Sequence, residues 1–160
     1  MTIQVGDKLP QITVSTMTEE GPKPVSMEEL CAGKKVVLFA VPGAFTPTCS
    51  VQHLPGFVTN AGNLKEKGVD LVACISVNDP FVMGAWGKDR SAGEEVLMLA
   101  DGNAEFTSAV GLEMDGSGFG LGKRSQRYAM IIDDGVVSTL NVESGPSVDV
   151  SSAEAILAAL

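Results

Sequence analysis

Two apolar runs separated by a helix-like stretch constrain the fold of this chain most strongly. Residues 35–42 (KVVLFAVP) and 69–77 (VDLVACISV) are short and rich in β-branched residues, as is typical of strands buried on both faces. Residues 47–67, between them, are too long for a loop and carry apolar residues at roughly helical spacing. Strands joined in this way pair in parallel. The pattern predicts a strand–helix–strand unit at the centre of a sheet.

The rest of the chain extends this unit into a mixed α/β sheet with helices on both faces. The Pro55-Gly56 step predicts a kink in the central helix, because proline removes a hydrogen bond and crowds the preceding turn. The turn Asp133-Asp134-Gly135 predicts an antiparallel hairpin of residues 128–133 and 136–140. Four further elements are expected, namely a strand at 96–100 and helices at 80–90, 104–110 and 151–160, the last opened by a serine cap.

Length and composition predict one folded domain, residues 1–160. Apolar residues make up 44% of the chain and charged residues 19%, as in ordinary globular domains. The net charge of -9 disfavours binding to nucleic acids and anionic membranes. No apolar run approaches the roughly 18 residues that a membrane span requires. The first residues lack the pattern of a signal peptide, so a cytoplasmic location is expected.

The three cysteines, Cys31, Cys49 and Cys74, do not form the pattern of a disulfide framework. Their number is odd and small, and without a secretory signal the chain fits a reducing compartment. The glycine-rich segment 114–123 suggests a nucleotide-binding loop, but Ser117 occupies the position of the first glycine and Arg124 follows Gly122-Lys123. A flexible surface loop is therefore expected there.

Cys49 lies where a predicted strand gives way to a predicted helix. Thr46 and Pro47 are strong helix-start residues, so Cys49 would be the third residue of the helix. Exposed N–H groups and the helix dipole favour an anion at that place, and so favour a thiolate. Free cysteine is also a common small core residue, but the polar neighbours Thr48 and Ser50 favour a functional position.

The segment 42–50 (PGAFTPTCS), continued by Gln52-His53-Leu54-Pro55-Gly56-Phe57, resembles the active site of the peroxiredoxins. The resemblance is strongest to the type five branch, called type II in plants and bacteria. It extends through residues 72–79, Trp86-Gly87, residues 124–130 and Asn141-Val142-Glu143, and so covers nearly the whole chain.

This resemblance implies a thioredoxin-like fold and a thiol peroxidase that reduces hydrogen peroxide and alkyl hydroperoxides. Cys49 would be the nucleophile, Thr46 and Arg127 would bind the peroxide oxygens, and Pro42 would shield the thiolate. Arg124 and Lys123 lie close to Arg127 in the sequence, and either could be the real partner. No bound cofactor or metal is implied, and a homodimer is expected.

A second thiol must reduce the sulfenic acid that peroxide leaves on Cys49. Some members of the family carry a resolving cysteine after the Asn-Val-Glu segment, but residues 144–152 contain none. Cys74 matches a second cysteine of type II members, yet it lies in an apolar run that predicts core packing. Cys31 is expected to be incidental, at a helix end. We therefore expect an external reductant, glutathione with glutaredoxin, or thioredoxin, as the resemblance implies.

Three other functions agree with parts of the pattern. His53 follows Cys49 by one helical turn, as in a cysteine–histidine hydrolase, but no orienting Asn or Asp is evident, and a packing or hydrogen-bonding role is expected instead. A thioredoxin-like disulfide reductase would need a cysteine where Gln52 stands. A redox sensor or holdase that uses oxidation of Cys49 is the third alternative.

Overall fold

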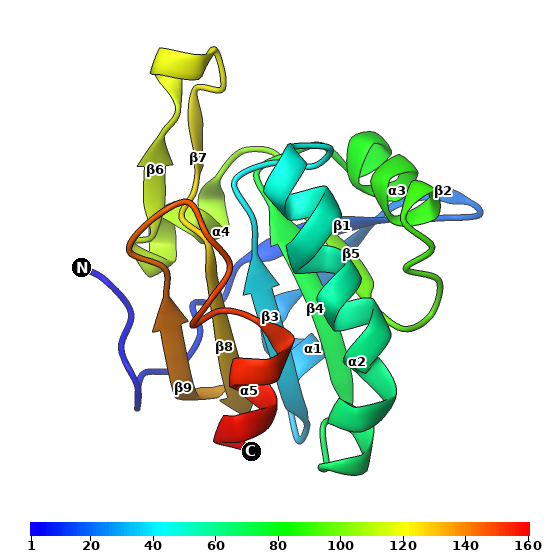
Figure 1. Cartoon of the computed structure of the whole chain (residues 1–160), viewed down its shortest axis with the longest axis vertical. Helices are drawn as coiled ribbons and strands as arrows, with labels where there is room; N and C mark the ends of the chain where they lie inside the picture. The colour runs from blue at the N-terminus through cyan, green and yellow to red at the C-terminus, as the bar shows by residue number, and fades with distance from the viewer.

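The computed structural model describes residues 1–160. They fold around a seven-stranded mixed β-sheet (Figure 1). Its strands, in order across the sheet, are β2 (Gly21–Ser26), β1 (Thr13–Thr18), β5 (Leu97–Ala100), β4 (Leu71–Ser76), β3 (Lys35–Ala40), β8 (Tyr128–Asp133) and β9 (Val136–Val142). The three central strands β5, β4 and β3 are parallel, and the remaining pairs are antiparallel. The predicted central pair and the predicted hairpin of β8 and β9 are confirmed.

Four α-helices connect strands, and a fifth follows the last strand. They are α1 (Met27–Cys31), α2 (Leu54–Glu66), α3 (Pro80–Asp89), α4 (Glu105–Val110) and α5 (Ala153–Ala159). The hydroxyl of Ser152 accepts a hydrogen bond from the amide of Ala155, which confirms the serine cap expected for the last helix. None of the helices combines the length and the apolar character that crossing a bilayer demands.

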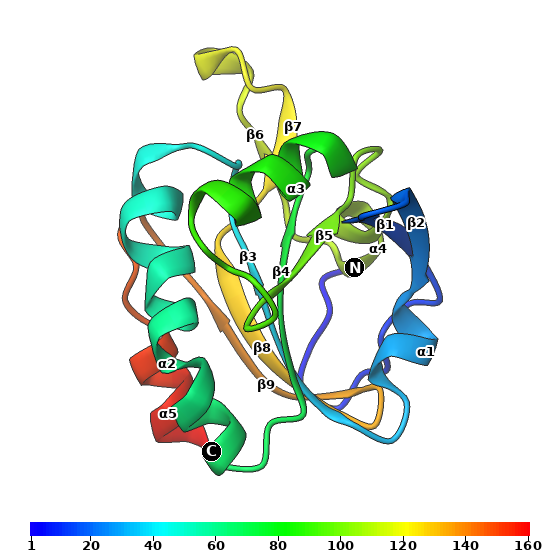
Figure 2. The same ribbon diagram turned by 90° about the vertical axis from the view of Figure 1, so that its right-hand side faces the viewer.

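The sheet carries an apolar core on each face. Alternate residues of β3 point to opposite sides, with Val37 and Phe39 in one core and Val36 and Leu38 in the other. Helices α2, α3 and α5 cover the first face and α1 and α4 the second. Figure 2 shows α2 and α5 on the opposite side of the sheet from α1. Burial on both faces explains why the central strands are apolar throughout.

The helix after β3 is continuous but contains one wide turn. It begins at Pro47, runs as a π-helix over η1 (Cys49–His53) and continues as α2. At the junction the amide of Leu54 donates to the carbonyl of Cys49, five residues back. The next residue, Pro55, has no amide hydrogen and could not continue the regular ladder. The predicted kink therefore takes the form of a π-helical turn.

The segment 114–123, expected to be a flexible surface loop, does lie at the surface but contains regular structure. This segment belongs to an arm formed by β6 (Glu113–Asp115) and β7 (Lys123–Ser125), with a short 3₁₀ turn, η2 (Ser117–Phe119), near its tip. The arm projects from the body of the molecule (Figure 1). Each strand has only three residues, too few to show alternation in the sequence. Phe119, at the tip, is 88% exposed.

Candidate active site around Cys49

Cys49 lies in the first turn of the helix that follows β3, as predicted, and its side chain is fully buried. The loop before the helix is fixed to the neighbouring strand. The amide of Ala44 donates to Oδ1 of Asn78 at 3.0 Å, and the hydroxyl of Ser76 donates to the same oxygen at 2.6 Å. The ends of β3 and β4 thereby set the position of the helix start.

Thr46 starts the helix, as predicted, but its side chain does not cap a helix amide. Its carbonyl accepts the first helical bond, from the amide of Ser50 at 2.9 Å. Its hydroxyl donates to the carbonyl of Gly43 at 2.7 Å instead of accepting from a helix amide. A hydroxyl oxygen used in this way keeps its lone pairs. Thr46 can therefore accept a hydrogen bond from a bound hydroxyl or hydroperoxide group.

Arg127 is the cationic partner of Cys49. It directly precedes β8, is 7% exposed, and its Nη2 lies 3.1 Å from Sγ of Cys49. The neighbouring Arg124 points elsewhere, with Nε donating to the carbonyl of Leu121 and Nη1 to that of Pro42. A permanent positive charge at this distance attracts a thiolate and presents N–H donors to any atom bound beside it.

His53 supports Arg127. Its Nδ1 lies 2.9 Å from Nη1 of Arg127, and its Nε2 lies 2.9 Å from the carbonyl oxygen of Ser151. Burial, followed by the charge of Arg127, lowers the pKa of His53 to about 4, and the Ser151 carbonyl and Glu143 only partly oppose this shift. Both ring nitrogens are engaged, so neither is free to take a proton from Cys49. This geometry disfavours a cysteine–histidine hydrolase and agrees with the expected hydrogen-bonding role.

Glu143 and Ser151 complete the support, and neither role was expected from the sequence. The amide of Glu143 donates to the carbonyl of Arg127 at 2.9 Å. Its carboxylate accepts from the amide of Asp149 and from both the amide and the hydroxyl of Ser151. Burial raises the pKa of Glu143, but these hydrogen bonds outweigh it and hold the pKa below its usual range. Glu143 thus ties residues 149–151 to the end of β9.

Cys74 and Cys31 lie in opposite cores. Cys74 is fully buried in β4, on the same face of the sheet as Cys49, and burial raises the pKa of its thiol well above the usual value. Cys31 is the last residue of α1, as expected, and burial raises its pKa to about 11. Both environments favour the neutral, unreactive thiol. All three cysteines are free.

A groove of about 760 Å³ leads from the surface to Arg127. Pro42 and Thr46 line one part of it, and Met114, Phe119 and Leu121 of the arm line another. The groove therefore joins a polar end at Arg127 to an apolar side that can accommodate a carbon chain.

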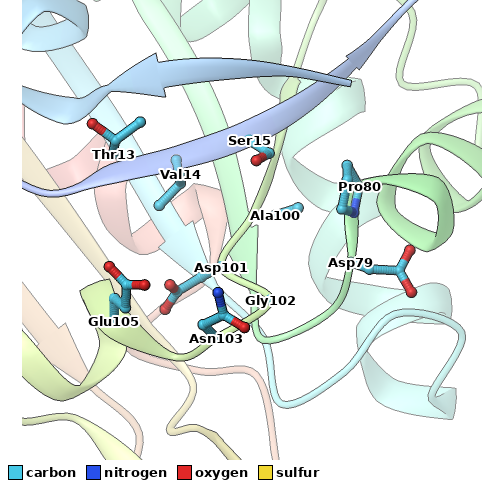
Figure 3. Close-up of a pocket in the computed structure, with 10 residues that line it drawn as sticks. All are labelled: Thr13, Val14, Ser15, Asp79, Pro80, Ala100, Asp101, Gly102, Asn103 and Glu105. Atoms are coloured by element: carbon cyan, nitrogen blue, oxygen red, sulfur yellow. The ribbon is translucent and has the colours of Figure 1, made fainter. Parts of the chain in front are cut away.

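A second pocket, of about 270 Å³, lies between β1 and the start of α3 and α4 (Figure 3). Its two aspartates cap helices: Asp101 accepts from the amides of Phe106 and Thr107, and Asp79 accepts from that of Val82. No cysteine or histidine lines it. These bonds give the two aspartates a structural role.

The chain is similar to several known proteins over nearly its whole length. Residues 4–157 match the family model described as Redoxin. Peroxiredoxin-2E, chloroplastic, from Arabidopsis thaliana is 56% identical over 162 residues, which cover 99% of this chain and 69% of that protein. Peroxiredoxin-2B from the same plant is 53% identical over 159 residues, which cover 99% and 98%. The crystal structure of reduced Prx3 from Vibrio vulnificus in complex with H₂O₂ superposes with a TM-score of 0.95 at 63% identity, covering 99% of both chains.

Proposed function

Since this chain belongs to the peroxiredoxins of the Redoxin family and is a thiol-dependent peroxidase, we propose that Cys49 is the sulfur that attacks the peroxide. The observation that carries the proposal is the 3.1 Å contact between Nη2 of Arg127 and Sγ of Cys49. Neither of the other two thiols has such a partner, and burial raises the pKa of both.

The neighbours of Cys49 suggest how the peroxide is held. The peroxide hydroxyl donates to Oγ1 of Thr46, whose own hydrogen is engaged with Gly43. The guanidinium of Arg127 donates to the peroxide oxygens and stabilises the negative charge that grows as the O–O bond breaks. Pro42 lines the groove above them and shields the sulfur from water. Fixed donors of this kind lower the barrier without reorganising during the reaction.

The proposed reaction consumes one peroxide and one thiolate. The sulfur of Cys49 forms a bond to the terminal oxygen, and the O–O bond breaks heterolytically. The products are a sulfenic acid on Cys49 and an alkoxide or hydroxide, which takes up a proton and leaves as alcohol or water. Sulfur is oxidised by two electrons and the peroxide is reduced by two.

We infer that an external thiol completes the cycle. It condenses with the sulfenic acid to give a mixed disulfide and water, and a second thiol then releases Cys49. Residues 144–152 provide no cysteine, and Cys74 is fully buried. Glutathione with glutaredoxin, or thioredoxin, is the proposed donor. The cytoplasmic location expected from the sequence stays a prediction.

We also infer that two copies of the chain associate. Three phenylalanines, Phe45, Phe81 and Phe119, are between 51% and 88% exposed. Phe45 lies in the loop before the Cys49 helix, Phe81 in the first turn of α3 and Phe119 on the arm. A second copy that covers one or more of these rings would remove them from water.

Two cysteine variants test the proposed roles. Cys49→Ser should abolish peroxide consumption, because serine lacks the thiolate nucleophile. Cys74→Ser should retain much of the activity when glutathione and glutaredoxin are supplied. Peroxide consumption is measured with a panel of purified thiol donors. Loss of turnover in Cys74→Ser would overturn the external-donor proposal, and slow stoichiometric oxidation of Cys49 without turnover would indicate a redox sensor.

A further inference from the structure

His53 can occupy its position in only one protonation state. An arginine nitrogen can only donate a hydrogen bond, so Nδ1 of His53, 2.9 Å from Nη1 of Arg127, must carry no proton. A carbonyl oxygen can only accept, so Nε2, 2.9 Å from the carbonyl of Ser151, must carry one. The imidazole is therefore neutral, with its hydrogen on Nε2.

We propose that His53 is a positioning residue of the peroxidase reaction, which holds the guanidinium of Arg127 through a neutral acceptor so that its charge is directed at Cys49. This inference rests on the proposed role of Cys49. It gives the single histidine of the chain a function distinct from acid–base chemistry.

The neutrality of the anchor matters because Arg127 faces two partners at once. Nη1 meets the imidazole and Nη2 meets the sulfur of Cys49. A carboxylate at the place of the imidazole would offset much of the guanidinium charge, whereas a neutral acceptor orients the group and leaves that charge available. The charged groups that act on the imidazole are Arg127, which lowers its pKa, and Glu143, which raises it; burial and Arg127 prevail and hold the pKa of His53 near 4, so the neutral form prevails at neutral pH.

The surroundings of His53 fix its ring in this orientation. Its ring lies 4.9 Å from that of Phe39 and 5.6 Å from that of Phe57, centroid to centroid. Its partner Ser151 is held by the carboxylate of Glu143, whose amide in turn donates to the carbonyl of Arg127. The hydrogen bonds thus form a closed circuit from Arg127 through Glu143, Ser151 and His53 back to Arg127. Rotation of the imidazole would break two of them.

The test measures the rate constant for a single turnover, in which hydrogen peroxide oxidises the reduced protein in the absence of any reductant. Trp86 provides the signal, because it is the single tryptophan and its Nε1 donates to the hydroxyl of Ser50, next to Cys49. The rate constant should fall about 10- to 100-fold in His53→Leu, since a loosened donor stabilises the developing charge less well. His53→Asn, which keeps an acceptor close to the position of Nδ1, should recover part of the loss.

A double-mutant cycle with Arg127→Gln separates positioning from a general structural effect. If His53 acts through Arg127, His53→Leu should slow the Arg127→Gln enzyme far less than it slows the wild type. Losses that multiply in the double variant would overturn the proposal, as would a wild-type rate in His53→Leu.

Two controls complete the experiment. Val110→Ala creates a cavity in the opposite core and should lower stability while leaving the rate unchanged. Cys49→Ser should give no oxidation signal. If the fluorescence change persists in Cys49→Ser, the proposed function itself is refuted. If Cys49→Ser loses the change but His53→Leu reacts at the wild-type rate, only the role of His53 is refuted.

Discussion

The guanidinium of Arg127 contacts two functional side chains. Nη2 of Arg127 contacts the sulfur of Cys49 and Nη1 contacts His53, so the planar group bridges nucleophile and anchor. The ammonium group of lysine is a single point of charge and cannot reproduce this fork. Shape as well as charge is therefore required at position 127.

Arg127→Lys should lower the rate constant of Cys49 oxidation by about 100- to 1000-fold, the range found when one fixed donor to a developing charge is lost. Stopped-flow fluorescence of the reduced protein with hydrogen peroxide provides the measurement. Lys123→Gln, which removes an exposed neighbouring cation, is the matched control and should keep the wild-type rate. A similar loss in both variants would mean that overall positive charge, and not the Arg127 contact, drives the reaction.

His53 should also make stability depend on pH. Its pKa falls from 6.5 to about 4 on folding, so between these values only the unfolded chain takes up the proton. The free energy of unfolding should therefore decrease as the pH falls from 6.5 to about 4, by up to about 3 kcal/mol in total. The lowered pKa of Glu143 adds a smaller loss in the same direction below its ordinary value of 4.5.

Urea unfolding at a series of pH values measures this dependence. His53→Asn removes the titrating group, so its stability should change much less between pH 6.5 and 4. Equal slopes for wild type and variant over this range would show that other groups cause the effect.

The reactive residues were easier to predict than their supports. Cys49, Thr46 and Pro42 belong to one short segment at a strand–helix junction, and the family pattern added Arg127. The geometry places all four at one site, although their catalytic roles stay predictions. Glu143 and Ser151 could not be found in this way, because they act through hydrogen bonds to residues distant in the sequence. For Glu143, the resemblance of Asn141-Val142-Glu143 to the family was the only indication in the sequence.

Among the secondary-structure elements, the strands buried on both faces and the hairpin with an Asp-Gly turn were predictable, whereas the hairpin at the opposite edge of the sheet was not. Strands β3 and β4 are apolar throughout, and the Asp134-Gly135 turn has positive φ at both residues, as an Asp-Gly hairpin signal implies. The hairpin of β1 and β2 was missed. Strand β2 contains Pro22 and Pro24, which argue against a strand unless it lies at an edge, where β2 does lie.

Glycines in two helices should respond to alanine in opposite ways. Gly62, within α2, has open space where an alanine Cβ would lie, with no neighbouring atom within 4 Å, so Gly62→Ala should stabilise the protein by about 0.5–1 kcal/mol through helix propensity. At Gly84, within α3, an alanine Cβ would lie 2.7 Å from Cβ of Met17 in β1. That atom cannot move without the strand, so Gly84→Ala should destabilise by about 1–3 kcal/mol.

Thermal unfolding of both variants measures these changes in stability. A stable Gly84→Ala protein would mean that α3 can shift away from β1 at little cost. Retained secondary structure by circular dichroism is the control for both variants.

For the molecule as a whole, the net charge and the exposed aromatic rings both bear on the proposed dimer. The chain carries a net charge of -9, yet Phe45, Phe81 and Phe119 are exposed. Like charges oppose self-association, so a dimer requires an apolar contact of this kind.

Phe81→Glu should therefore weaken the proposed dimer if Phe81 lies in the contact, because it replaces an exposed aromatic ring by a charge without altering either core. Sedimentation velocity over a range of protein concentrations measures the association. Val5→Glu, which changes an exposed apolar residue outside this group of phenylalanines, is the matched control and should leave association unchanged. A monomeric wild type would contradict the proposal directly.

The circuit around Arg127 also bears on the order of folding. The bonds that join Arg127 to His53 and to Cys49 span 74 and 78 residues, and the bond from His53 to Ser151 spans 98. Contacts so distant along the chain form only after the intervening segments have closed. A growing polypeptide therefore exposes its sulfur long before the guanidinium can reach it. The environment that the guanidinium provides for Cys49 therefore forms late in folding, after residues far apart in the sequence have come together.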